Sequence, residues 1–158
     1  MPHTARPAKS AFEQRNPDWE TTVRQSFARQ KVMNLIGGEM GALGLGRCEI
    51  RLPFREDLTQ QNGYFHAGIT GTIVDSAGGY AGLTLMPPGA EVLTVEFKLN
   101  LLAPADGEFL VAEGQVLKSG RNLVITRGEV YVIKRGKATH CATMQQTLMT
   151  MHPKAPKA

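Results

Sequence analysis

Asp75 is the residue of this sequence with the clearest potential for chemistry. It carries the only formal charge between Asp57 and Glu91. The surrounding run is apolar and rich in glycine, and a carboxylate is costly to bury there without a partner. Asp75 is therefore a candidate catalytic group. The alternative is a purely structural carboxylate, neutral or hydrogen-bonded at an interface.

Small residues flank Asp75 on the helix that the run predicts. Residues three and four positions away share its face. They are Thr72, Gly71, Gly78 and Gly79. This face leaves room for a ligand in front of the carboxylate, although close packing of a sheet around the helix would also require small residues.

The start of the same helix offers a second group. The first amides of a helix have no partner within it and carry partial positive charge. Those of Ala67 and Gly68 can therefore polarise a carbonyl or hold an oxyanion, while His66 either caps the helix or takes part. Ala67 and Asp75 differ in height by about 12 Å. If both act on one carbonyl, they must come from different subunits of a dimer.

Hydrophobic periodicity supplies the elements that would position these groups. An amphipathic helix is expected from residue 17 to about 36 and a central helix from 67 to about 85. The clearest strand has Leu93, Val95, Phe97, Leu99 and Leu101 on one face. The other strands are expected at 44–52, 108–117, 122–133 and 138–149. Short turns require antiparallel neighbours, so one sheet of about five strands should curl around the central helix.

Composition narrows the class of protein. The 158 residues predict one domain over 17–150, with flexible segments at 1–16 and 151–158. No apolar run suits a membrane span or a signal peptide, which makes a cytoplasmic location the expectation. Cys48 and Cys141 lack metal-type spacing and are interpreted as reduced structural residues. The net charge of +4 suits an anionic ligand, and no nucleic-acid motif is present.

The residues singled out above also form a known pattern. QQNGYFHAGITGTIVDSAGGYAG from Gln60, followed by TVEFKLNLLAP from Thr94, resembles the hotdog-fold acyl-CoA thioesterases, and most of all their phenylacetic-acid-degradation branch. The family motif places a polar residue and Gly before His-Gly-Gly, with Asp nine residues after the His. The resemblance covers residues 40–149 and includes the strand order. It implies an α+β hotdog fold, with an additional N-terminal helix here.

The resemblance implies a role for each matching residue. Asp75 would be the nucleophile or the general base that activates water, and the Ala67 amide would polarise the thioester carbonyl. His66 would orient the loop or the sulfur leaving group. Gln60 would hold water or the thioester, and Thr94 would assist near the water. Two positions depart from the family, since Ala67 replaces a Gly and Gln60 replaces an Asn.

The same resemblance implies an acyl-CoA substrate, no cofactor or metal, and a homodimer with sites at its interface, with a dimer of dimers as the expected assembly. An apolar acyl pocket would be lined by Tyr64, Phe65, Val74 and Tyr80. The other candidate substrate contacts are Asn62, Gly63, Gly68, Ser76, Gly79, Lys118 and Arg121. Two further functions on this fold stay open, a non-catalytic acyl-CoA binding or sensing module and a dehydratase or hydratase.

Overall fold

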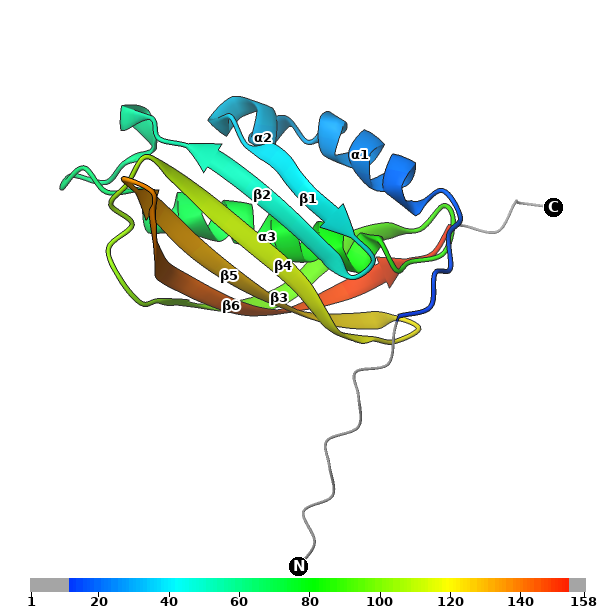
Figure 1. Ribbon diagram of the computed structural model, residues 1–158. Helices are drawn as coiled ribbons and strands as arrows, with labels where there is room; N and C mark the ends of the chain where they lie inside the picture. The colour runs from blue at the N-terminus through cyan, green and yellow to red at the C-terminus, as the bar shows by residue number, and fades with distance from the viewer. Residues whose placement is uncertain (1–11, 154–158) are drawn as a thin grey trace, which may run out of the picture.

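A six-stranded antiparallel sheet curls around one long helix in the computed structural model, which describes residues 12–153 (Figure 1). The helices are α1 (Trp19–Arg29), α2 (Lys31–Ile36), the short 3-10 helix η1 (Glu56–Leu58) and α3 (Ala67–Leu83). The strands are β1 (Glu39–Gly44), β2 (Arg47–Pro53), β3 (Glu91–Leu101), β4 (Phe109–Ser119), β5 (Leu123–Lys134) and β6 (Lys137–Met151). This is the predicted α+β hotdog arrangement with an N-terminal helical segment.

The order of the strands puts β1 and β3 at the two edges of the sheet. It runs β1-β2-β4-β5-β6-β3, so β3 pairs with β6 alone although it precedes β4 in sequence. Alternate residues of β4, β5 and β6 face α3 and are buried. The helix is therefore enclosed by the middle of the sheet, and the edge strand β3 lies along one side of it.

Two glycines on the strands allow the sheet to approach α3 closely. A Cβ at Gly114 of β4 would lie 2.3 Å from the carbonyl carbon and oxygen of Ala77. A Cβ at Gly128 of β5 would lie 2.3 Å from Cγ2 of Val74. Both distances are far below van der Waals contact, so the middle of the sheet packs against the helix backbone only because these positions lack side chains.

Two predicted elements of the N-terminal third differ in the structure. The strand expected at 44–52 begins only at Arg47, as β2, because Gly46 at φ +73 reverses the chain there, and β1 before it is a sixth strand that was not expected. The Gly46 backbone N–H donates to Thr84 Oγ1 at 2.7 Å, which ties the turn to the end of α3. The single helix expected at 17–36 is broken at Gln30, whose ψ of 96° is extended.

The N-terminal end of the described chain packs against the domain. The predicted flexible segment 1–16 lies outside the described residues as far as residue 11, and residues 154–158 of the predicted C-terminal segment also lie outside. Phe12 packs against the hydrophobic core, and Asn16 is buried with its amide donating to Thr22 Oγ1. None of the helices within residues 12–153 is long and apolar enough to cross a bilayer.

Candidate functional site

His66 caps the N-terminus of α3. Its backbone is extended, and its Nδ1 accepts a hydrogen bond of 2.9 Å from the Gly68 amide. A neutral imidazole that accepts at Nδ1 carries its proton on Nε2. The Gly68 amide is thus occupied, whereas no described residue accepts from the Ala67 amide. Of the two predicted oxyanion donors, Ala67 is the one that remains available.

The loop before α3 brings Gln60 to the same end of the helix. The Gln60 backbone N–H donates to the Tyr64 carbonyl at 2.8 Å across a tight turn, in which Gly63 adopts φ +79. The Asn62 amide donates to Gln60 Oε1. A small cavity of about 150 Å³ lies beside this turn. Its lining includes Gln60, Tyr64, Phe65, Ala67, Leu101 and Cys141.

Asp75 lies in the middle of α3 and is half-buried. Its Oδ1 accepts 2.7 Å from Thr94 Oγ1 on β3 and 2.6 Å from Gln146 Nε2 on β6. No described residue donates to its other carboxylate oxygen, Oδ2. One oxygen is thus held by two donors, and the second is available to a water molecule or a thioester carbonyl carbon.

A β-bulge at Val95 turns Thr94 toward the helix. The pairing of β3 with β6 shifts by one residue between Thr94 and Glu96, so Val95 has no partner. Thr94 is opposite Leu148, and Phe97 is opposite Gln146, both of which are buried against α3. The predicted alternation, which placed Thr94 and Phe97 on opposite faces, is therefore wrong.

The predicted catalytic residues thus form two separate clusters within one subunit. His66, Ala67 and Gln60 lie at the start of α3, and Asp75 and Thr94 lie two helical turns further on. Eight residues of α-helix span about 12 Å. One thioester carbonyl is far smaller than this separation, so it cannot contact both clusters of the same chain.

The edge strand β3 exposes an unusual amount of apolar surface. Leu93, Val95, Phe97 and Leu101 are each more than half exposed. Phe97 and Leu101 lie on the face of β3 that turns toward α3, yet the single chain leaves both of them more than half exposed. A sheet edge with unpaired backbone groups and exposed apolar side chains is a typical pairing surface.

Comparison with known proteins gives the family. The family model of the thioesterase superfamily matches residues 62–139. A Saccharolobus solfataricus protein that bears an esterase name is 33% identical over 121 residues, which are 76% of this chain and 77% of that protein. The chain belongs to the thioesterase superfamily. It is accordingly an enzyme of the thioester-hydrolysing class.

Other relatives of this thioesterase agree with the assignment. Human acyl-coenzyme A thioesterase 13 is 32% identical over 98 residues, 61% of this chain and 68% of that protein. The crystal structure of a thioesterase family protein from Silicibacter pomeroyi is 45% identical, with a TM-score of 0.83, over 84% of this chain and 98% of that one.

More distant solved structures show the fold alone. The Escherichia coli PaaI protein of the phenylacetic acid degradation operon is 13% identical, with a TM-score of 0.75, over 85% of this chain and 94% of that one. A Bacillus halodurans protein solved with CoA is 21% identical, with a TM-score of 0.69, over 85% of this chain and 84% of that one.

Four of the predicted contact residues of the thioesterase lie inside its own core, among them Phe65, which is 3% exposed. Val74 is fully buried, and the Tyr80 ring packs edge-to-face on Phe27 with ring centres 5.6 Å apart. Ser76 is 7% exposed, and its hydroxyl accepts from Gln30 Nε2 of the break between α1 and α2. Gly79, by contrast, has no atom within 4 Å of the position of a Cβ, so space remains beside it.

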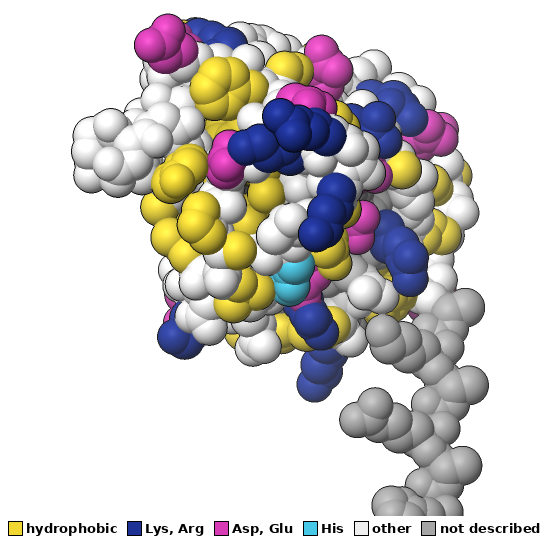
Figure 2. All heavy atoms as spheres, turned by 60° about the vertical axis from the view of Figure 1, so that its left-hand side comes forward, with side chains coloured by type: hydrophobic (Ala, Val, Ile, Leu, Met, Phe, Trp, Pro, Cys, Tyr) yellow, Lys and Arg dark blue, Asp and Glu magenta, His cyan; other side chains and the backbone are white. Residues whose placement is uncertain are grey.

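The predicted phosphate contacts Lys118 and Arg121 lie at the β4–β5 hairpin. Figure 1 shows this hairpin at the opposite end of the molecule from the loop that precedes α3. In the space-filling view, Lys and Arg side chains are interspersed with Asp and Glu, and hydrophobic side chains gather toward the left (Figure 2). This view brings forward the end of the molecule that holds the loop before α3, and the face that it shows has no uniformly basic field.

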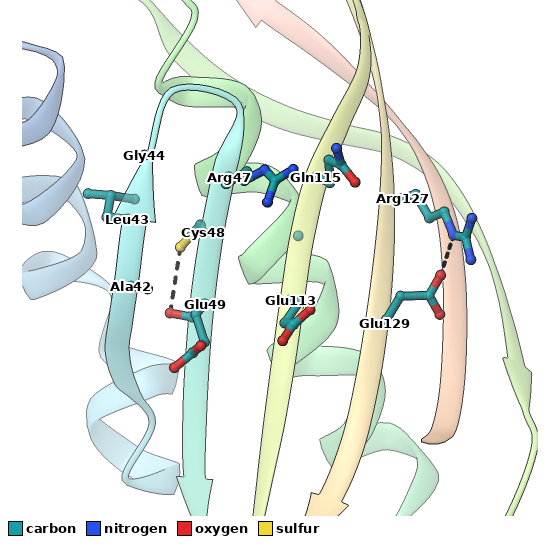
Figure 3. Close-up of a pocket in the computed structure, with 11 residues that line it drawn as sticks. Ala42, Leu43, Gly44, Arg47, Cys48, Glu49, Glu113, Gln115, Arg127 and Glu129 are labelled. Atoms are coloured by element: carbon teal, nitrogen blue, oxygen red, sulfur yellow. Dashed lines mark hydrogen bonds and ion pairs between the residues drawn. The ribbon is translucent and has the colours of Figure 1, made fainter. Parts of the chain in front are cut away.

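A larger cavity, of about 500 Å³, lies on the outer face of β1, β2, β4 and β5 (Figure 3). None of the predicted site residues lines it. Three of its charged lining residues are in ion pairs. Glu129 contacts both Arg127 and, at 2.6 Å, His140 Nε2, and Glu49 is 2.6 Å from Arg51. The two clusters of α3, which hold the predicted catalytic residues, therefore remain the candidate site.

The cysteines do not offer a nucleophile. Cys141 lines the small cavity but is 1% exposed, and its thiol donates to the Val130 carbonyl. Burial raises the pKa of the Cys141 thiol to about 11 and that of Cys48 to about 12. Both are therefore neutral at physiological pH, and a neutral thiol is a poor nucleophile.

Sequence reasoning missed Gln146, which contacts the Asp75 carboxylate directly. Its position carried a signal that was not used. Met144, Gln146 and Leu148 alternate along one face of β6, so Gln146 is a polar residue within a buried apolar row. A buried amide requires partners, and the lone carboxylate of the central helix was an available one.

Proposed function

We propose that this thioesterase hydrolyses acyl-CoA thioesters with Asp75 as nucleophile or general base. The observation that carries the proposal is the asymmetric environment of the carboxylate. Oδ1 is held by Thr94 and Gln146, and Oδ2 is without a described partner. An ionised carboxylate with one oxygen fixed and the other available suits either direct attack or proton abstraction from water.

The start of α3 supplies the groups that would polarise the thioester carbonyl. Attack on the thioester carbon moves charge onto the carbonyl oxygen, which the Ala67 amide and the N-terminal dipole of α3 would stabilise. Gln60, beside the same cavity, would hold the thioester or the water. Collapse of the tetrahedral intermediate breaks the carbon–sulfur bond and releases the CoA thiolate. His66, with Nε2–H as a donor, is suited to orient that sulfur.

The two halves would meet across a dimer. The separation of about 12 Å along α3 prevents a complete site within one chain. The exposed edge of β3 offers the surface for a second copy, because Phe97 and Leu101 face the helix side yet remain more than half exposed. In an isologous dimer, Asp75 of each chain would be opposite Ala67 of the other. Pairing of two dimers into a tetramer stays a prediction.

The substrate class is proposed from the family and from the site. Acyl-coenzyme A thioesterase 13 is among the relatives, which supports a CoA thioester. Tyr64 offers apolar surface beside Ala67, and Phe65 lines the same cavity although it is only 3% exposed. The roles of Asn62, Gly63, Gly79, Lys118 and Arg121 as substrate contacts stay predictions, as does membership of the phenylacetic-acid-degradation branch.

The first experiment measures thiol release from a panel of aromatic, medium-chain and long-chain acyl-CoAs by the wild type and by Asp75→Asn. The variant keeps the shape of the side chain and removes its charge. We expect turnover to fall by about two orders of magnitude or more, with an unchanged circular dichroism spectrum. Wild-type protein that binds acyl-CoAs and releases no thiol from any of them would contradict the proposal.

A complementation experiment tests the shared site. Asp75→Asn and Gln60→Ala subunits, each inactive alone, are mixed and allowed to exchange. If Asp75 and Gln60 of one site come from different chains, half of the dimers are mixed and each holds one intact site. About a quarter of wild-type activity should return. No recovery, with exchange confirmed by mass spectrometry, would place both residues of a site in one chain.

A further inference from the structure

Gln146 of β6 is a buried side chain for which the proposed chemistry does not account. It is 2% exposed, and both ends of its amide are bonded. Nε2 donates to Asp75 Oδ1 at 2.6 Å and to the Asp75 backbone carbonyl at 3.2 Å. Oε1 accepts from Thr126 Oγ1 of β5 at 2.8 Å, and Thr126 is fully buried.

The chemistry of the partners fixes the direction of this chain of hydrogen bonds. An ionised carboxylate only accepts, so the NH₂ end of the amide must face Asp75. The carbonyl end then faces Thr126, whose hydroxyl can turn to donate. If the amide were reversed, its oxygen would oppose the carboxylate at 2.6 Å. Thr126 therefore holds Gln146 in the orientation in which its NH₂ group donates to Asp75.

Gly78 provides the space for this arrangement on the same helix as Asp75. A Cβ at Gly78 would lie 1.8 Å from Gln146 Oε1 and 2.8 Å from Thr126 Oγ1. The Gln146 amide thus occupies the place of the missing side chain, three residues after the carboxylate that it contacts. The same helix therefore supplies both the Asp75 carboxylate and, at Gly78, the space for the Gln146 amide that donates to it.

We propose that Gln146 is a positioning residue that, locked by Thr126, fixes Oδ1 of Asp75 and leaves Oδ2 turned toward the substrate. This inference deepens the proposed function and rests on it. Gln146 does not touch the reacting atoms, because the carboxylate lies between them. Its loss should therefore lower kcat and leave KM nearly unchanged.

The test compares Gln146→Leu with a matched pair, Thr126→Val and Thr126→Ser. Gln146→Leu should lower kcat by at least about tenfold, the effect of a lost hydrogen bond to a charged group. KM should stay within about twofold of the wild-type value. Thr126→Val keeps the shape of the side chain but frees the amide to reverse, and it should lower kcat in the same way. Thr126→Ser retains the hydroxyl and should restore kcat.

A second measurement does not depend on turnover. In protein labelled with ¹³C at the Asp carboxyl carbons, the Asp75 signal is identified by its absence in Asp75→Asn. Its chemical shift at pH 7 should change in Gln146→Leu and Thr126→Val, because the carboxylate loses a donor, and should stay near the wild-type value in Thr126→Ser. An unchanged chemical shift and kcat in folded variants would overturn the role of Gln146. A wild type without thioesterase activity would overturn the proposed function, and the chemical shift would still decide whether Gln146 holds the carboxylate.

Discussion

The close approach of Gln146 to Gly78 allows a quantitative prediction of the stability of a Gly78→Ala variant. The new methyl group must push away the amide oxygen, because their separation would be 1.8 Å. The amide then loses its bond to Asp75, a charged acceptor, at about 1.5–3 kcal/mol, and its bond to Thr126 at about 1 kcal/mol. The higher helix propensity of Ala restores about 1 kcal/mol of the free energy of unfolding. The net loss is about 1.5–3 kcal/mol of unfolding free energy, or roughly 3–12 °C in melting temperature for a domain of this size.

Gly82→Ala is the matched control on the same helix. Its Cβ would lie 2.4 Å from Cδ1 of Leu148, the end of a side chain with no hydrogen bond to lose. Rotation of that group costs about 0.5–1.5 kcal/mol, which the gain in helix propensity offsets. Urea unfolding at one fixed protein concentration, together with thiol release, compares the two variants. If Gly78→Ala matched Gly82→Ala in stability and the wild type in turnover, the amide would not be held as argued.

Two other predictions concern the edge strand and the thiols. Phe97→Glu should shift the protein toward monomer in light scattering, whereas Leu35→Glu, at a 74% exposed position of α2, should not. If the Phe97→Glu variant remained dimeric, β3 would not be part of the interface. Burial raises the pKa of the Cys48 thiol from 9.0 to about 12 and that of Cys141 to about 11. The folded state therefore favours the neutral thiols, so stability is intact below pH 9 and should fall above it by about 1 kcal/mol per thiol per pH unit. Urea midpoints at pH 8 and 10 measure this, and a Cys48→Ala, Cys141→Ala variant with an equal fall would refute it.

The sequence predicted most elements because their signals were local. The start of α3 follows from the capping residue His66, and β4, β5 and β6 follow from apolar runs separated by short turns. The break at Gln30 was missed because the helical spacing of apolar residues continues through it. The β1–β2 hairpin was missed because Gly46 was interpreted as part of a strand. Its turn depends on a contact with Thr84, which is distant in the sequence.

The site required information that no local pattern contains. Strict alternation along β3 puts Thr94 on the face opposite Phe97, and a hydroxyl on that face would point away from Asp75. Two residues on one face at an odd separation require an extra residue between them, and Val95 is that residue. The bulge forms where β3 pairs with β6, about fifty residues later in the chain, so its position depends on the register of that pairing. It brings the Thr94 hydroxyl to 2.7 Å from the same carboxylate oxygen that Gln146 of β6 contacts. The irregular pairing of β3 with β6 therefore builds both donors of Asp75 at once.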